Sequence, residues 1–128
     1  MRSLLAPGGE LFIHAAHSFS SCLDFDGDRI IYGYFDDRYE HLVVFSSRTY
    51  TDGVDVAPST MYEWNHSLSG ILSVLCAQGL MIDSLLEHDW TVFQQFPWLT
   101  ESSPGYWVVP SERPRITLSF TPLAHRLD

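Results

Sequence analysis

The segment from residue 66 to residue 79 carries the clearest periodic pattern in the chain. Its apolar residues recur at positions i, i+3, i+4 and i+7, which is the spacing of one face of an α-helix. They are Leu68, Ile71, Leu72 and Leu75. Asn65 or Ser67 can cap the start of this helix, and Gly79 suits the left-handed position after its end. The sequence therefore predicts one helix over this segment, with its apolar residues on one face.

Three segments have the character of β-strands. The run Leu11–Ala16 follows the Pro7-Gly8-Gly9 turn and is almost continuously apolar, which is typical of a strand buried on both faces of a parallel sheet. Residues 80–87, which begin with Leu80-Met81-Ile82 directly after Gly79, are predicted to form a second strand. Ile116–Thr121 alternates strictly and is predicted to end at Pro122, because proline has no N–H group for the ladder. Strands on both sides of a helix indicate the α/β class.

Residues 18–64 are more polar and more aromatic than the rest, and we interpret them as one long insertion that bears a hairpin. Asp26-Gly27 and Asp52-Gly53 are turn signals. We predict strands over Ile30–Phe35 and around Leu42–Phe45. Residues 90–114 contain four prolines and are interpreted as a connection. No linker divides the chain of 128 residues, so we predict a single domain.

Charge and cysteine content exclude several classes of function. Seven basic and 16 acidic residues give a formal charge of −9, which disfavours nucleic acid and anionic membranes as partners. All seven basic residues are arginine, so Schiff-base chemistry is excluded. Cys22 and Cys76 are interpreted as free thiols. Because no signal peptide and no membrane span is recognisable, we expect a soluble cytoplasmic protein.

Several segments together resemble the C-terminal half of class I S-adenosylmethionine-dependent methyltransferases, of the bacterial small-molecule type. The Pro-Gly-Gly turn with its flanks is similar to the family's approach to strand five. The segment after residue 62 is similar to the family's last helix and sixth strand. The matching segments are Arg2–Ile13, Tyr62–Leu68, Ala77–Ile82, Leu86–His88, Tyr106-Trp107 and Arg113–Ile116.

This resemblance implies the C-terminal portion of a Rossmann-like sheet. Residues 10–16 would be strand five, residues 80–87 strand six, and residues 115–125 an antiparallel strand seven between them. The implied parts are residues 1–17 (helix end, turn and strand five), residues 18–64 (a lid over the acceptor) and residues 65–128 (last helix, strands six and seven). The implied activity is transfer of a methyl group from S-adenosylmethionine to a small molecule.

The chain departs from the family where the cofactor is bound. Family members hold S-adenosylmethionine with a Gly-rich loop after strand one and with groups on strands two and four, and none of these segments is present. The chain contains no G-x-G sequence. We therefore expect an incomplete domain that does not bind the cofactor alone and is inactive alone. The alternative is a noncatalytic module that binds a ligand or completes a partner chain. An unpaired edge of Leu11–Ala16 would favour self-association.

His17 is the first candidate site residue. It follows the strand at its carboxyl edge, where open α/β sheets receive ligands, and an imidazole can accept a proton from an acceptor hydroxyl or amine. The alternative is a hydrogen-bonded loop residue. An aromatic wall around the acceptor is the second prediction, although the same rings could form the core of the lid. Its members are Tyr32, Tyr34, Phe35, Tyr62 and Trp64. His66 either lines that pocket or helps to start the helix.

Two metal-like patterns do not predict a metal site. His14 and His17 are three positions apart on a strand, so their side chains point to opposite faces of the sheet. Asp24-Phe25-Asp26-Gly27-Asp28 resembles the start of a calcium loop, but Arg29 and Phe35 stand where that loop needs Gly and Glu. A hairpin turn is the preferred interpretation. Glu87 and His88, at the end of the predicted sixth strand, are interpreted as surface residues.

Overall fold

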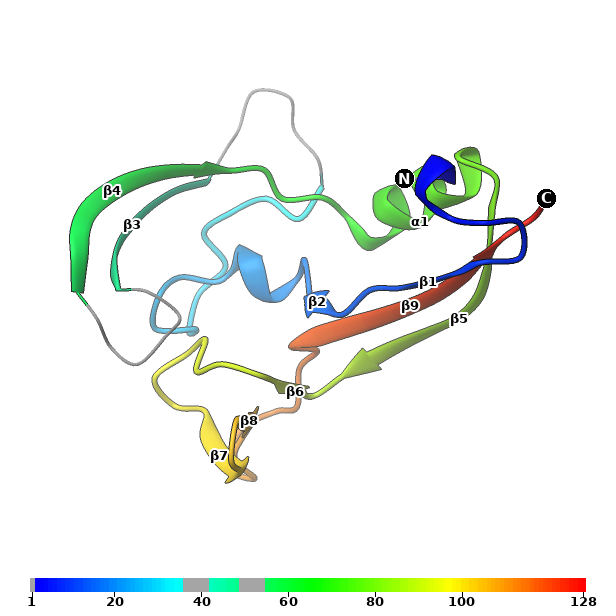
Figure 1. Ribbon diagram of the computed structural model, residues 1–128. Coiled ribbons are helices and arrows are strands. Elements are labelled where there is room, and N and C mark those ends of the chain that lie inside the picture. The colour runs from blue at the N-terminus through cyan, green and yellow to red at the C-terminus, as the bar shows by residue number, and fades with distance from the viewer. Residues whose placement is uncertain (1, 36–41, 49–54) are drawn as a thin grey trace.

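The computed structural model describes residues 2–35, 42–48 and 55–128. Its main sheet is organised around β9 (Ser119–Arg126) (Figure 1). One edge of β9 pairs with β1 (Glu10–Phe12) and β2 (Ala15–Ala16), and the other edge pairs with β5 (Leu80–His88), in each case antiparallel. The predicted order, with the last strand antiparallel between the other two, is confirmed. The mixed α/β class is confirmed as well.

The prediction of a parallel sheet is wrong, because every strand pairing in the described parts of the chain is antiparallel. The apolar run Leu11–Ala16 was taken to be buried on both faces. In the structure Leu11 packs into the core beside Ala124, whereas Phe12 is 68% exposed on the opposite face. A Rossmann-like parallel sheet is therefore not a feature of the described residues.

Pro122 lies inside β9, so the prediction that this strand spans Ile116–Thr121 and ends at the proline is wrong. The Ile13 N–H donates to the Pro122 carbonyl oxygen at 3.2 Å. Pro122 has no N–H to return, and the edge strand is interrupted there between β1 and β2. On the other edge, β5 has a register shift between Ile82 and Ser84. The sheet thus accommodates a proline in its central strand by interrupting its edge partner.

Helix α1 (Leu68–Ala77) confirms the predicted helix. The Ser67 side chain accepts a hydrogen bond from the Gly70 N–H as the N-cap, and Gly79 has a left-handed φ of 77°. Leu75 is buried against Leu80 and Ala124 of the sheet. Residues Leu5, Leu11, Leu72 and Ile82 pack around this cluster. The helix therefore covers one face of the main sheet, and the 3₁₀ helix η1 (Arg2–Leu4) lies on the same side (Figure 1).

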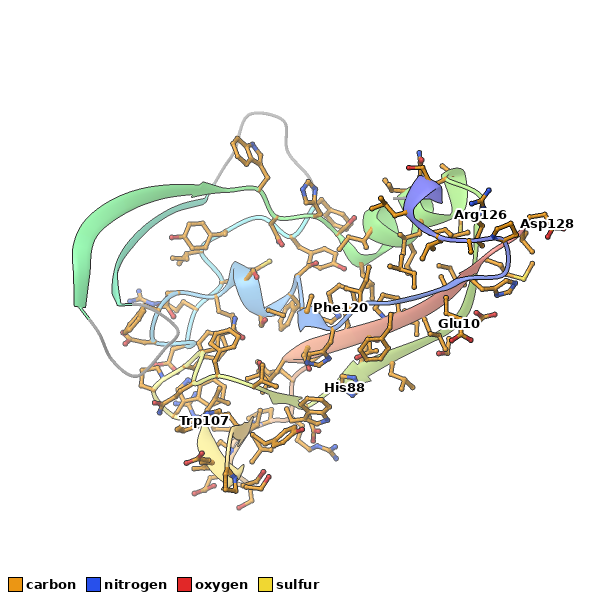
Figure 2. All side chains as sticks on the ribbon, in the orientation of Figure 1. Glu10, His88, Trp107, Phe120, Arg126 and Asp128 are labelled. Carbon is orange, nitrogen blue, oxygen red and sulfur yellow. The ribbon has the colours of Figure 1, made fainter. Side chains whose placement is uncertain are left out.

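A second core lies below the main sheet, in a region that sequence analysis treated only as a connection. β6 (Trp90–Thr91), β7 (Thr100–Ser103) and β8 (Tyr106–Val108) form a small sheet in the order β6-β8-β7. Phe96, Leu99 and Leu118 are its buried centre. Trp107 packs against this cluster and is labelled on β8 in Figure 2.

The segment 18–64 contains η2 (Ser20–Cys22) and a hairpin of β3 (Leu42–Arg48) and β4 (Asp55–Glu63). The strand predicted around Leu42–Phe45 is confirmed, whereas Asp52-Gly53 lies outside the described residues. The strand predicted over Ile30–Phe35 is wrong. Only Ile30 makes a bridge, to Leu23, and the Ile31 and Tyr32 N–H groups both donate to the Cys22 carbonyl.

The turn predicted at Asp26-Gly27 is confirmed. Gly27 has a φ of 71°, and a Cβ at this position would lie 2.7 Å from Trp98 Nε1 and 2.8 Å from the Phe96 ring. Only glycine fits there, because the turn packs directly against Trp98 and Phe96. This contact joins the 18–35 segment to the second core. No helix in the described residues is long and apolar enough to cross a membrane.

Candidate functional site

The carboxyl ends of β2 and β5 lie beside the start of β9, and the candidate site is at this point. β2 and β5 run in the same direction because both are antiparallel to β9. His17 follows β2 directly, and Glu87 and His88 are the last residues of β5. Figure 2 labels His88 at this end of the strand. Two strands thus end at the same edge and bring their last side chains together, which makes this edge a candidate binding site.

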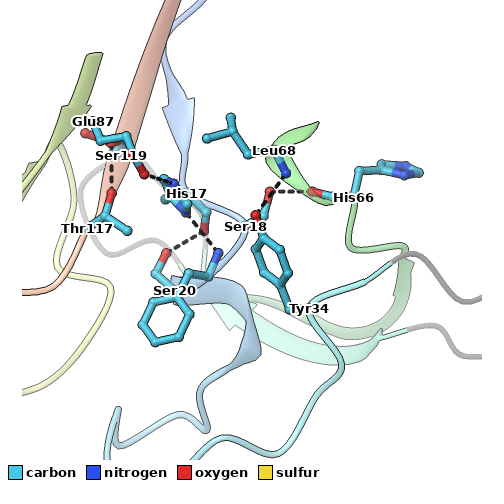
Figure 3. A network of polar contacts seen from close by, with 10 residues as sticks. His17, Ser18, Ser20, Tyr34, His66, Leu68, Glu87, Thr117 and Ser119 are labelled. Carbon is cyan, nitrogen blue, oxygen red and sulfur yellow. Dashed lines mark hydrogen bonds and ion pairs between the residues drawn. The ribbon is translucent and has the colours of Figure 1, made fainter. Parts of the chain in front are cut away.

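His17 and Glu87 form a close pair on the face of the sheet that α1 covers. His17 Nε2 lies 2.6 Å from Glu87 Oε2, and the His17 Nδ1 accepts a hydrogen bond from the Phe19 N–H at 3.0 Å (Figure 3). The Ser20 hydroxyl donates to the His17 carbonyl at 2.7 Å. Because Nδ1 accepts a hydrogen bond from the backbone, the ring proton is on Nε2, and Nε2 donates a hydrogen bond to Glu87.

Burial divides this pair into an inner and an outer partner. His17 is 3% exposed and its ring meets the edge of Phe120, whereas the Glu87 side chain is 51% exposed. Both ring nitrogens of His17 are engaged within the chain. The carboxylate of Glu87 is the member of the pair that a ligand can reach. The role of His17 as a base stays a prediction, and the geometry makes it the residue that orients Glu87.

A groove of about 250 Å³ opens at the end of β5. Arg115 contributes a guanidinium that holds Asp89 Oδ2 through Nη2 at 2.6 Å and Nε at 2.7 Å. The lining residues are Glu87, His88, Asp89, Arg115, Ile116 and Thr117. Asp89 and Arg115 were not predicted as site residues, and Glu87 and His88 were interpreted as surface residues. A single sequence gives no signal that would bring residue 87 beside residue 17.

The predicted aromatic wall is only partly brought together. Tyr34 and Phe35 meet edge to face with ring centroids 5.2 Å apart, and the Tyr34 hydroxyl accepts the Leu68 N–H at the start of α1. Phe35 and Trp64 are exposed. Tyr32 is exposed too, at 37%. Tyr62 pairs with Val43 in the β3–β4 hairpin, but its side chain lies outside the described residues. The groove at the end of β5 is lined by other residues.

His66 connects the candidate site to the start of the helix through its main chain. Its carbonyl oxygen accepts a hydrogen bond from the Ser18 hydroxyl, next to His17 (Figure 3). Asn65 reinforces this junction, because its side-chain amide donates to the Ser18 and Gly33 carbonyls, both at 3.1 Å. The amide also contacts the Cys22 thiol, whose pKa is raised by burial. Asn65 therefore ties the 18–35 segment to α1, a role that its sequence position did not indicate.

A second histidine cluster lies on the opposite face of the sheet. His14 Nδ1 and His88 Nε2 are 2.9 Å and 2.8 Å from the same atom, Thr121 Oγ1. Trp90 lies against both imidazole rings. Burial, and secondarily the charge of His88, lowers the pKa of His14. His14 and His17 therefore do point to opposite faces, as their spacing predicts.

The calcium-like segment is a turn in the structure. Asp24 Oδ1 accepts hydrogen bonds from the Asp28 and Arg29 N–H groups, at 2.9 Å and 3.3 Å. These backbone donors, Asp28 first, lower the pKa of Asp24. The carboxylate is thus used to close its own loop. In the residues that the structure describes, no group of three or more His, Cys, Asp or Glu side chains is arranged to hold a metal ion.

Comparison with known proteins adds no relative. No family model, curated protein or solved structure matches the chain significantly.

Proposed function

We propose that the chain is the acceptor-side part of a cytoplasmic S-adenosylmethionine-dependent methyltransferase that methylates a small molecule. The observation that carries the proposal is the placement of β9 antiparallel between β1/β2 and β5, with α1 leading into β5. The resemblance implies this order for strands five, seven and six. The candidate site lies at the carboxyl ends of the two outer strands, where the family's acceptor side would be.

The residues present do not fit S-adenosylmethionine. Within the described ranges, α1 is the single α-helix, and Ser67 rather than a glycine-rich loop precedes it. The left-handed glycines Gly8, Gly27, Gly79 and Gly105 lie in turns elsewhere. Another segment or chain must hold the cofactor. The chain's own contribution is to bind and orient the acceptor, through the exposed Glu87 carboxylate that His17 holds in place.

The exposed face of the main sheet favours a second candidate function, a noncatalytic module that completes a partner. Phe12, Met81 and Leu86 are all exposed on the face opposite α1. In the described part of the chain, β1 and β2 pair only with β9, so their outer edge is open. Exposed apolar faces and open strand edges are typical of interaction surfaces. The methyltransferase half needs the same cover, so this observation is compatible with both functions.

Methyl transfer by a joined protein tests the proposal. The cofactor-binding half of a small-molecule methyltransferase, with its Gly-rich loop, is fused to the N-terminus of this chain. Labelled S-adenosylmethionine is then offered with a panel of hydroxyl, thiol and amine acceptors. We expect transfer that requires this chain and falls about tenfold in Glu87→Gln, the loss expected for one charge-assisted hydrogen bond. A fusion that binds the cofactor but methylates none of the acceptors contradicts the proposal.

A further inference from the structure

The charges around the groove at the end of β5 do not cancel. Asp89 and Arg115 neutralise each other, since both guanidinium contacts go to one carboxylate. The His88 ring nitrogen Nε2 is engaged by Thr121 on the far face. Glu87 is the remaining formal charge among the groove residues.

The Glu87 carboxylate is held on one side and open on the other. The Phe19 N–H donates to His17 Nδ1, and His17 Nε2 lies 2.6 Å from Glu87 Oε2. His17 therefore contacts Glu87 through one hydrogen bond. A carboxylate with half of its surface open can form an ion pair with a cationic ligand.

We propose that this groove binds a small organic cation through an ion pair between its ammonium group and Glu87. The inference rests on the proposed function and names its acceptor class, a small molecule that carries an ammonium group in addition to the atom that accepts the methyl group. The formal charge of −9 acts in the same direction, since it attracts cations and repels anions. The groove, of about 250 Å³ and broadly open to solvent, suits a small ligand that is held mainly through one charged group.

His17 is the positioning residue of this site. It is buried, it has both ring nitrogens engaged, and it holds Glu87 Oε2 at 2.6 Å. The carboxylate is consequently oriented before a ligand arrives, which reduces the entropy lost on binding. Ile116 and the Thr117 side chain supply an apolar and a polar wall beside the charge.

The test compares two probes that differ mainly in charge, benzylamine and benzyl alcohol. Binding to the full chain is measured by NMR, with the His17 and His88 ring signals as reporters. We expect benzylamine to bind about tenfold more tightly than the alcohol, because a charge-assisted hydrogen bond exceeds a neutral one by about this factor. We also expect its affinity to fall with added salt.

Glu87→Gln is the matched variant, because its amide oxygen still accepts the His17 Nε2 proton. It should remove the preference for the amine and leave the affinity for the alcohol unchanged. Glu112→Gln, at an exposed carboxylate outside the groove, should keep the preference. Equal binding of both probes, no binding of benzylamine, or an unchanged preference in Glu87→Gln overturns the inference. Methyl transfer by the fused protein is measured separately, so failure of this inference can be distinguished from failure of the proposed function.

Discussion

The His17 ring and the Glu87 carboxylate are 2.6 Å apart, although 70 positions separate them in the chain. β9 makes this contact possible, because it holds β2 on one edge and β5 on the other. Phe120, near the start of β9, pairs with Ala15 on one edge and with Glu87 on the other. The His17 and Glu87 side chains meet next to it. The candidate site is therefore a property of the strand order.

The buried member of this pair should dominate its contribution to stability. His17→Ala removes the acceptor of the part-buried Phe19 N–H and should lower the free energy of unfolding by about 1–3 kcal/mol, the cost of leaving such a donor unsatisfied. Glu87→Gln should cost less than about 1 kcal/mol, since Glu87 is half exposed and glutamine still accepts. Urea unfolding of both variants measures the difference. Equal losses would show that the pair is not organised as described.

The core under α1 gives a second stability prediction. Leu75 is 5% exposed and contacts the sheet, whereas Val74 on the same helix is 61% exposed. Leu75→Ala should cost about 2–5 kcal/mol, while Val74→Ala should change the free energy of unfolding by less than about 0.5 kcal/mol. Thermal and urea unfolding check both values. Similar effects of the two substitutions would mean that the helix presents a different face to the sheet.

The cluster of His14, His88 and Thr121, on the face of the sheet opposite α1, predicts that the stability of the fold decreases in mild acid. The pKa of His14 is lowered in the folded state, first by burial and then by His88, so the unfolded state binds the proton more readily. Stability is accordingly lost as the pH falls below the ordinary histidine value of about 6.5. The Thr121 hydroxyl has one proton, so it can donate a hydrogen bond to only one of the two imidazole rings at a time.

The measurement is the urea midpoint at about pH 7 and about pH 5, where a histidine changes from neutral to charged. His14→Gln should lose less stability between these two conditions than the unchanged chain does. His66→Gln serves as the control, because its side chain is exposed. An identical pH dependence in His14→Gln and the unchanged chain would show that His14 is not the group responsible.

The open face predicts association of the isolated chain. Phe12, on β1 at the open edge of the sheet, is 68% exposed. Leu86, on β5 at the opposite edge, is 56% exposed. Sedimentation of the chain should show concentration-dependent self-association, and Phe12→Ser with Leu86→Ser should reduce it. Val92→Ser, at an exposed apolar residue after β6, is the control. A monomer at all concentrations would favour a self-sufficient module over an incomplete domain.

Local patterns in the sequence predicted the helix, but they did not predict all of the strands. The spacing from Leu68 to Leu75 and the cap at Ser67 depend only on neighbours along the chain, and the helix is found where they place it. The strand order followed from the resemblance. The run Leu11–Ala16 was misinterpreted because apolar content alone does not distinguish a strand buried on both faces from one with an exposed face. Pro122 was misinterpreted because its tolerance depends on an interruption in a strand more than 100 residues away.

The candidate site was predictable only in part. His17 was recognised from its place after a strand, but its partner was not, because the register between β9 and β5 decides that Glu87 faces it. His88 likewise meets His14 beside Thr121, with ring centroids 5.7 Å apart, only because β9 lies between their two strands. Such contacts are long-range consequences of strand pairing, and a single sequence contains no direct signal for them.

Calorimetric titration of S-adenosylmethionine decides whether this chain supplies the acceptor side while another segment or chain holds the cofactor. Titrated into the isolated chain, the cofactor should give no saturable heat at micromolar concentrations. Titrated into the chain fused to a cofactor-binding half, it should bind with one site per molecule, and Glu87→Gln should leave that affinity unchanged. Saturable micromolar binding by the isolated chain would contradict the account.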